Sequence, residues 1–126
     1  MPTILIVEDE PMISDIYQKK FRDQGFEVLS ATAGDQVLEM VRKQKKVDVI
    51  LLDLLIPKMD GFEVIRNLRN GRYDPKIKIV VSSNLNQLKD MDKAFALGAD
   101  SFFIKAHFTP SQVVREVNKI IGNIVI

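Results

Sequence analysis

The sequence predicts one α/β domain with a (βα)5 chain path, in which a parallel sheet lies between two layers of helices. Five apolar runs of strand length, rich in β-branched residues, alternate along the chain with segments of helical period. The chain has 126 residues, which suits one compact unit, because two smaller units would each have too little core. We therefore expect residues 1–126 to form a single domain without an internal linker.

The expected strands are short and almost wholly apolar, as strands buried on both faces of a parallel sheet are. Polar or glycine-containing segments bound each of them, which limits their length to a few residues. They cover Thr3–Val7, Val28–Ala31, Val47–Leu52, Ile77–Ser82 and Phe102–Ile104.

The first two helices follow from apolar periodicity. Within Met12–Gln24 the apolar residues recur at spacings of three and four, which is typical of a helix that buries one face, and Gly25 ends it. A second helix is expected over Asp35–Lys45, between the second and third strands.

End signals define the third and fourth helices. Asp60, with Glu63 three residues later, has the spacing of a capping box and predicts a helix that ends near Asn70. The fourth helix is expected over Gln87–Leu97, because Gly98 follows as a typical helix terminator.

The fifth helix has the clearest start. Thr109 suits the N-cap and Pro110 suits the first helical position. The Gln112 side chain can accept a hydrogen bond from the backbone N–H of the N-cap residue. This helix is expected to end at about Ile121. The five helices and five strands then alternate through the whole sequence.

Composition excludes several classes of protein. A chain that is 46% apolar and 28% charged is neither collagen-like nor disordered, and the absence of cysteine excludes disulfides and thiol catalysis. Eighteen basic residues against 17 acidic ones leave a net charge of +1, so no overall field attracts nucleic acid or an anionic membrane. The sequence contains no long apolar segment and no signal peptide. We expect a cytoplasmic protein that binds neither nucleic acid nor membranes.

Polar residues collect at the ends of the expected strands, where ligands bind in open α/β sheets. Glu8 and Asp9 follow the first strand and Asp53 follows the third. Ser83 and Lys105 follow the fourth and fifth, whereas no charged residue ends the second strand. The second strand therefore belongs at an edge, which favours the flavodoxin-like strand order 2-1-3-4-5.

Three carboxylates at one sheet edge repel each other, by about 4 kcal/mol for a pair about 4 Å apart at an effective dielectric constant of about 20. Either one of them retains a proton through a raised pKa, or a cation lies among them. An all-oxygen set of ligands without histidine or cysteine favours Mg²⁺, with Mn²⁺ as the alternative. Mg²⁺ leaves positions for phosphate oxygens, which Lys105 and Ser83 are chemically suited to contact.

Four segments together resemble the receiver domain of two-component response regulators: ILIVEDE, VDVILLDLLIPKMDG, VVSSN and GADSFFIK. Each segment alone is a weak signal, but their order and spacing are highly specific and cover essentially the whole chain. The resemblance implies a stand-alone or excised receiver, without the DNA-binding or enzymatic output domain found in many family members.

The resemblance also implies a phosphoacceptor and a metal site. Asp53 would accept a phosphoryl group from a histidine kinase or a histidine phosphotransfer protein. Asp9 and Asp53 would bind Mg²⁺ directly, together with the backbone carbonyl of Leu55, and Glu8 would bind it through water. Such a protein catalyses only its own phosphorylation and slow dephosphorylation, and is a monomer or a phosphorylation-dependent homodimer.

Three further residues have roles implied by the family. Ser83 matches the switch hydroxyl, Lys105 the lysine that pairs with the phosphate, and Phe102 the aromatic switch. In the family this switch alters the face formed by the fourth helix, the fifth strand and the fifth helix, which would contact a downstream protein that the sequence does not identify.

The sequence departs from the family's usual pattern at three places. Ala106 follows Lys105 where the family usually has proline after a cis bond; a non-proline cis bond costs about 2.5–4 kcal/mol, so either that cost is borne or the loop differs. Phe102 lacks the hydroxyl of a tyrosine, so switching there would depend on packing. Leu55 and Leu85, two residues after Asp53 and Ser83, occupy the positions that flank the phosphoryl group in this family. Neither can orient an attacking water, which predicts a long-lived aspartyl phosphate.

Other functions remain open at this point. A pseudo-receiver that has lost phosphorylation would use the same fold as an interaction surface, and Ala106 keeps that interpretation open. A phosphatase of the haloacid dehalogenase type also begins with a strand-end aspartate, but its second aspartate is replaced here by Leu55. A flavodoxin is disfavoured, because the acidic loop after Val7 would repel the phosphate of a flavin.

Overall fold

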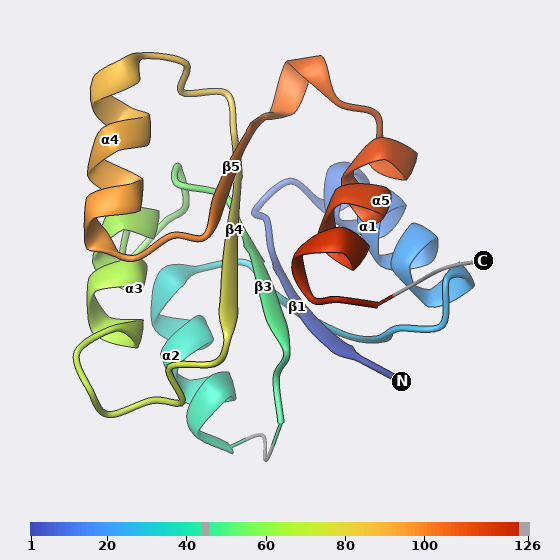
Figure 1. The fold of residues 1–126 in the computed structure, drawn as a ribbon, viewed down its shortest axis with the longest axis horizontal. Coiled ribbons are helices and arrows are strands. Elements are labelled where there is room, and N and C mark those ends of the chain that lie inside the picture. The colour runs from blue at the N-terminus through green and yellow to red at the C-terminus, as the bar shows by residue number, and fades with distance from the viewer. Residues whose placement is uncertain (44–45, 124–126) are drawn as a thin grey trace.

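The computed structural model describes residues 1–43 and 46–123 and has the predicted fold. Its five parallel strands form one sheet in the order β2-β1-β3-β4-β5. Helices α2, α3 and α4 cover one face of the sheet, and α1 and α5 cover the other (Figure 1). The three-layer architecture and the strand order are therefore confirmed.

The boundaries agree closely with those expected from the sequence. The strands are β1 (Thr3–Val7), β2 (Glu27–Ala31), β3 (Val49–Leu52), β4 (Lys78–Ser83) and β5 (Ser101–Ile104). The helices are α1 (Pro11–Asp23), α2 (Gly34–Lys43), α3 (Gly61–Leu68), α4 (Leu88–Leu97) and α5 (Pro110–Ile120), and a 3-10 turn, η1 (Lys105–His107), joins β5 to α5. None of the described helices is long and apolar enough to cross a membrane.

Several strand boundaries differ by one or two residues from those predicted, and one of them lies at the candidate site. Ser83 is the last residue of β4, paired with Ile104, and does not follow the strand as predicted. The third strand begins at Val49 and not at Val47; just before it, the Asp48 side chain accepts a hydrogen bond from the Thr3 backbone N–H at 2.7 Å. The predicted end of the second helix, at Lys45, lies outside the described residues.

The register brings the strand ends to one edge of the sheet. Val7, the last residue of β1, lies beside Leu52 of β3, and Leu52 in turn lies beside Val81 of β4. Residues that follow β1 and β3 are therefore level with each other and with the last residues of β4. This parallel register is what brings sequence-distant polar residues together.

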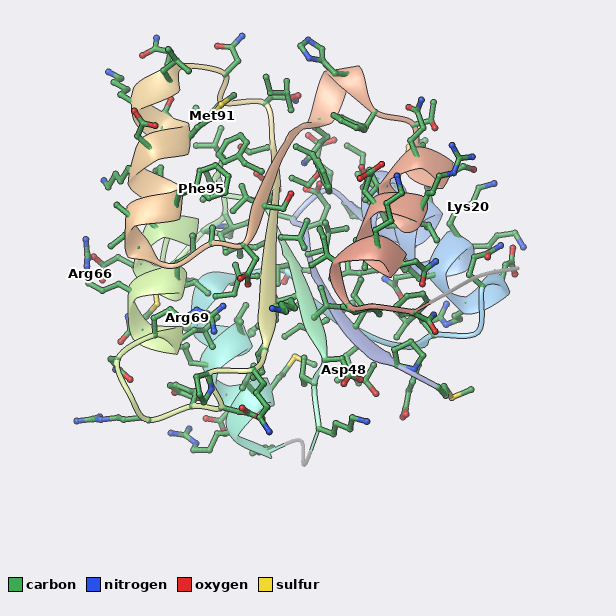
Figure 2. All side chains as sticks on the ribbon, viewed as in Figure 1. Lys20, Asp48, Arg66, Arg69, Met91 and Phe95 are labelled. Carbon is green, nitrogen blue, oxygen red and sulfur yellow. The ribbon has the colours of Figure 1, made fainter. Side chains whose placement is uncertain are left out.

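Side-chain alternation divides the core into two parts, one on each face of the sheet (Figure 2). In β1, Leu5 and Val7 join the cluster beneath α2, α3 and α4, whereas Ile4 and Ile6 join the cluster beneath α1 and α5. All four side chains are buried. A register slip of one residue would move each of them to the other face, so the apolar strands leave little freedom in how the sheet pairs.

The helix caps are present, with one difference from expectation. Thr109 Oγ1 accepts a hydrogen bond from the Gln112 backbone N–H at 3.2 Å, and Gln112 Oε1 accepts one from the Thr109 backbone N–H at 2.8 Å. Asp60 likewise accepts from the Glu63 backbone N–H at 3.0 Å. The Glu63 carboxylate pairs with Arg66, however, so only half of the predicted capping box forms at α3.

Gly61 allows the start of α3 to lie against the chain that leaves β3. A Cβ at this position would lie 2.6 Å from Leu54 Cα and 2.9 Å from the carbonyl oxygen of Asp53. The Gly61 N–H also donates to the Leu54 carbonyl at 3.0 Å. Any larger residue at Gly61 must therefore displace the backbone that carries Asp53.

We expect Gly61→Ala to lower the free energy of unfolding by about 1–3 kcal/mol, because the added methyl group meets backbone atoms that cannot move independently. Urea unfolding measures this change. Asp92→Ala, an exposed substitution on α4, is the control and is expected to stay within about 0.5 kcal/mol of the wild type. Equal unfolding midpoints for the two variants would contradict the close approach.

Candidate functional site

The three predicted carboxylates meet at the carboxyl edge of the sheet. Glu8, Asp9 and Asp53 each offer an oxygen atom within 4.8 Å of the others. Glu8 and Asp9 directly follow β1, and Asp53 directly follows β3, so the pairing of these strands places them together. Glu8 and Asp53 are buried, at 3% and 8% exposure, whereas Asp9 is exposed. A ligand therefore reaches the cluster from the side of Asp9.

Lys105 lies between the two buried carboxylates. Its Nζ donates to Glu8 Oε1 at 2.5 Å and to Asp53 Oδ2 at 3.0 Å. The lysine side chain is only 13% exposed, so these ion pairs form largely away from water and are screened less than surface pairs. The sequence suggested that this lysine contacts phosphate. In the structure, its ammonium group contacts the carboxylates of Glu8 and Asp53.

The pKa values of this group reflect burial and mutual attraction. Burial raises the pKa of the Glu8 carboxyl above its ordinary value, and the hydrogen bond and charge of Lys105 offset only part of that rise. Burial by itself would lower the pKa of Lys105, but the hydrogen bonds and charges of Glu8 and Asp53 outweigh burial and raise it. Lys105 therefore carries a positive charge at neutral pH and opposes the repulsion between the carboxylates.

Backbone groups fix the orientation of the same carboxylates. The Leu55 N–H donates to Asp53 Oδ1 at 3.1 Å, and the Glu10 N–H donates to Glu8 Oε2 at 3.3 Å. Each carboxylate oxygen has two lone pairs, so these contacts leave acceptor capacity for a cation. Three carboxylates close together with no nitrogen or sulfur ligand are a donor set that fits Mg²⁺.

The two predicted switch residues lie on one face of the sheet, beside α2, α3 and α4. Ser83 is fully buried, and its Oγ accepts a hydrogen bond from the Leu85 N–H at 3.4 Å. Phe102 lies beside Val81 in the β4–β5 ladder and packs against the core cluster on that face. No hydrogen bond joins Ser83 to Asp53 in the described part of the chain, so the switch roles of Ser83 and Phe102 stay predictions.

The sequence left open whether the peptide bond between Lys105 and Ala106 is cis or trans, and the structure answers this. No peptide bond is cis among the described residues, so the bond to Ala106 is trans and the loop differs from the usual family pattern. The Ala106 N–H donates to Asn84 Oδ1 at 3.2 Å, a bond that proline could not make because it has no N–H. Lys105 still reaches Asp53, so a trans bond does not displace it.

The hydrogen bond from Ala106 to Asn84 was not predicted from the sequence. The position of Asn84, directly after the buried strand β4, was the available signal.

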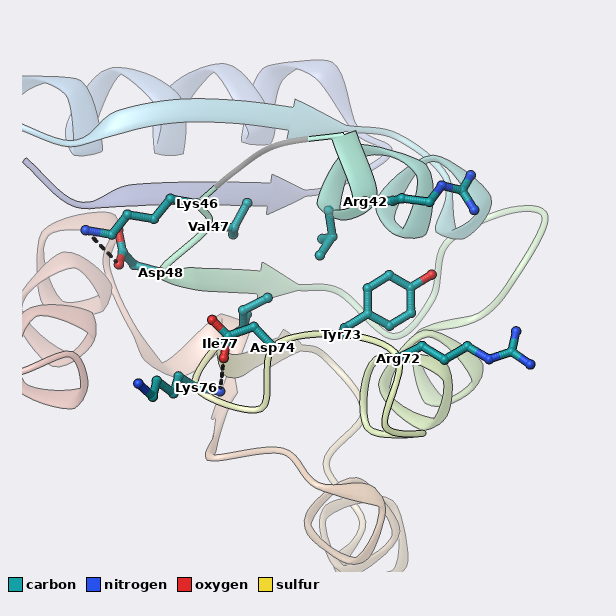
Figure 3. A pocket seen from close by; sticks show the side chains of 10 residues that line it. Arg42, Lys46, Val47, Asp48, Arg72, Tyr73, Asp74, Lys76 and Ile77 are labelled. Carbon is teal, nitrogen blue, oxygen red and sulfur yellow. Dashed lines mark hydrogen bonds and ion pairs between the residues drawn. The ribbon is translucent and has the colours of Figure 1, made fainter.

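The size of pockets does not identify this site. A pocket of about 480 Å³ lies at the amino ends of β3 and β4, at the opposite end of the sheet (Figure 3). It is lined by residues such as Arg42, Asp48 and Tyr73, and by none of the predicted site residues. The acidic cluster borders a cavity of only about 10 Å³. The arrangement of charges, and not volume, is what distinguishes the carboxyl edge.

Comparison with known sequences agrees with this geometry. The model of the family described as response regulator receiver domain matches residues 4–118. The chain belongs to this family. The receiver is 35% identical over 115 residues to the DNA-binding dual master transcriptional regulator RpaA of a Synechocystis strain, a match that covers 91% of this chain and 47% of the relative. It is 30% identical over 122 residues to response regulator SaeR of Staphylococcus epidermidis, covering 97% of this chain and 51% of the relative.

Solved structures share the fold of the receiver. The receiver domain of the Francisella response regulator 1452 has a TM-score of 0.88 at 22% identity, covering 97% of this chain and 98% of that one. The receiver domain of the sensor histidine kinase PA1611 of Pseudomonas aeruginosa has a TM-score of 0.85 at 24% identity, covering 96% and 98%, and its structure contains a magnesium ion in the active-site cleft. At these identities the likeness shows the fold.

The protein is thus a receiver domain of two-component systems with an acidic cluster compatible with Mg²⁺. The chain spans about half the length of the curated relatives described above. One of these relatives is a DNA-binding regulator, so the expectation that nucleic acid is no partner has no support from the comparisons. The absence of an output domain stays a prediction.

We expect Mg²⁺ to raise the thermal unfolding midpoint of the wild type, because binding to the folded carboxylate cluster stabilises the folded state. Asp9→Asn removes the exposed charged ligand and is expected to weaken Mg²⁺ affinity by about tenfold or more. Thermal unfolding at increasing Mg²⁺ concentration measures this. Glu10→Gln changes a neighbouring exposed acid outside the cluster and is expected to behave as the wild type; equal Mg²⁺ responses for the two variants would exclude the proposed site.

Proposed function

We propose that this receiver accepts a phosphoryl group on Asp53. The observation that carries the proposal is the environment of this side chain: a buried carboxylate in contact with the Lys105 ammonium and within 4.8 Å of two further acidic ligands. Positive charge around a carboxylate is what permits attack on an anionic phosphoryl group. The matching family model supports the same conclusion.

The donor would be a phosphohistidine of a histidine kinase or a histidine phosphotransfer protein. An oxygen of Asp53 attacks phosphorus, a phosphorus–oxygen bond forms, and the phosphorus–nitrogen bond to the donor imidazole breaks. The imidazole leaves with the electron pair of that bond and takes up a proton. The chain then acts on itself and turns over no external substrate, which separates it from an enzyme in the usual sense.

Residues of the cluster would hold Mg²⁺ and the transferred group. Asp9 and Asp53 would bind the metal directly, the Leu55 carbonyl would be a further ligand, and Glu8 would contribute through water. When bound, Mg²⁺ neutralises negative charge on the phosphoryl oxygens and on the carboxylates. Lys105 would contact the phosphoryl group from its present position, with Nζ 3.0 Å from Asp53 Oδ2.

Phosphorylation would change the surface formed by α4, β5 and α5, and a partner would bind to this surface. A phosphoryl group adds about −1.5 to −2 charge and new acceptor oxygens, which attract the Ser83 hydroxyl. Movement of Ser83 would open space on the face of the sheet beneath α2, α3 and α4, where Phe102 packs. On α4, Figure 2 shows Met91 and Phe95 on the side towards β5, and Phe95 is 48% exposed. A downstream protein or a second copy of the chain would bind there after phosphorylation.

Incubation with acetyl phosphate and Mg²⁺ is expected to add about 80 Da to the intact protein, the mass of one phosphoryl group. Asp53→Asn is expected to show no gain, because the amide cannot act as the nucleophile. Asp60→Asn, at the exposed cap of α3, is the control and should gain mass like the wild type. No gain in the wild type would exclude phosphoacceptor activity towards this donor and favour the pseudo-receiver alternative.

We expect the aspartyl phosphate to be long-lived, because Leu55 and Leu85 occupy the two positions that flank the phosphoryl group in this family, and neither side chain can orient water. Leu85→Glu and Leu55→Asn are expected to speed the loss of phosphate by about tenfold or more, measured by the decay of the phosphorylated mass after removal of the donor. Leu88→Glu places the same new side chain on an exposed residue of α4 and is expected to leave the rate unchanged. Unchanged decay in both site variants would refute this explanation.

A further inference from the structure

Ser82 is a buried polar residue for which the site described above has no role. Its side chain is 3% exposed, and within residues 1–43 and 46–123 its Oγ is the one buried side-chain nitrogen or oxygen atom without a hydrogen-bond partner. A buried hydroxyl without a partner costs free energy, so native proteins rarely retain one without a reason. The neighbours of Ser82 indicate what that reason is.

The Ser82 side chain lies beside the charged cluster. Ser82 pairs with Phe103 in the β4–β5 ladder, and the preceding residue of β4 pairs with Leu52, so Ser82 and Asp53 occupy neighbouring positions. Ser82 lines the small cavity of about 10 Å³ together with Glu8, Asp53, Lys105 and the apolar or aromatic residues Ile6, Val7, Tyr17 and Leu51. This volume is at the lower limit of the space that one water molecule needs, and the cavity offers the polar partners that a water requires.

Lys105 has an unused donor at the same place. A lysine ammonium carries three N–H donors, and Lys105 directs two of them at Glu8 and Asp53. The third has no protein acceptor among the hydrogen bonds of the described residues, although the lysine side chain is only 13% exposed. Lys105 and Ser82 each lack one partner, and both line the same cavity.

We propose that Ser82 is a positioning residue for Lys105, binding the third N–H of its ammonium through one water molecule in this cavity. This inference rests on the proposed function of Asp53. The hydroxyl accepts from the water, which in turn accepts from the ammonium, so that both groups are satisfied without a further charge.

A neutral partner has a specific advantage at this site. Glu8 and Asp53, the present partners of Lys105, are also candidate ligands of Mg²⁺, so the metal competes with the lysine for their oxygens. Ser82 carries no charge and is not one of the three acidic residues that could hold a metal ion. It would therefore still be available to the ammonium if Mg²⁺ occupied oxygens of the carboxylates.

The threonine and valine variants of Ser82 make a matched pair, because the two side chains have nearly the same shape and differ in the hydroxyl group. The initial rate of mass gain with acetyl phosphate and saturating Mg²⁺ is expected to fall by about threefold to tenfold in Ser82→Val, the range for one hydrogen bond. Ser82→Thr is expected to stay close to the wild type. In nitrogen-15 spectra, the Lys105 ammonium signal should persist in the threonine variant and broaden through faster hydrogen exchange in the valine variant.

The outcomes separate this inference from the proposed function. Equal rates and equal ammonium spectra for Ser82→Thr and Ser82→Val would overturn it, since packing alone would then explain Ser82. Tyr17→Phe tests the other hydroxyl at the cavity: it is expected to leave the rate unchanged, and a loss equal to that of Ser82→Val would assign the partner to Tyr17 and also overturn the inference. A wild type that gains no mass would contradict the proposed function instead, while the ammonium spectra would still test the contact between Ser82 and Lys105.

Discussion

The ion pairs of Lys105 with Glu8 and Asp53 are the interaction on which the site depends. Parallel pairing of β1 with β3 forces two buried carboxylates to the same edge of the sheet, where their charges repel. The lysine reaches them from the end of β5, two strands away from β3, and so connects the outer part of the sheet to its centre. Removing one partner of such a buried pair leaves an uncompensated charge, which costs far more than a surface pair is worth.

Alternation along the strands places the charged cluster and the predicted switch residues on different faces of the sheet. Glu8, Asp53, Ser82 and Lys105 line one small cavity, together with apolar residues of the core cluster beneath α1 and α5. Ser83 follows Ser82 directly and therefore points to the opposite face, where Phe102 also packs. Two neighbouring serines of β4 thus serve different sides of the sheet: one faces the charged cluster, and the other faces the helices that would transmit a signal.

The β5–α5 connection shows how one fold accommodates a local substitution. Ala106 stands where the family usually has proline. Unlike proline, alanine has a backbone N–H that can donate a hydrogen bond in this turn. The Asn84 side chain supplies that partner from the end of β4, and the 3-10 turn η1 follows. A hydrogen bond thus joins the segment after β4 to the turn after β5, at a position where proline would contribute a rigid ring and no N–H.

The strands, the helices, the strand order and the charged residues at the strand ends could all be predicted from the amino-acid sequence. These features depend on local apolar periodicity, on cap residues such as Thr109, and on which strands end in charge, all of which can be read along the chain. The positions of the third donor of Lys105, the hydroxyl of Ser82 and the amide of Asn84 become visible only in the folded chain. These groups come from different strands and loops, and whether a hydrogen bond forms depends on distances of a few tenths of an ångström that strand packing sets and local sequence does not.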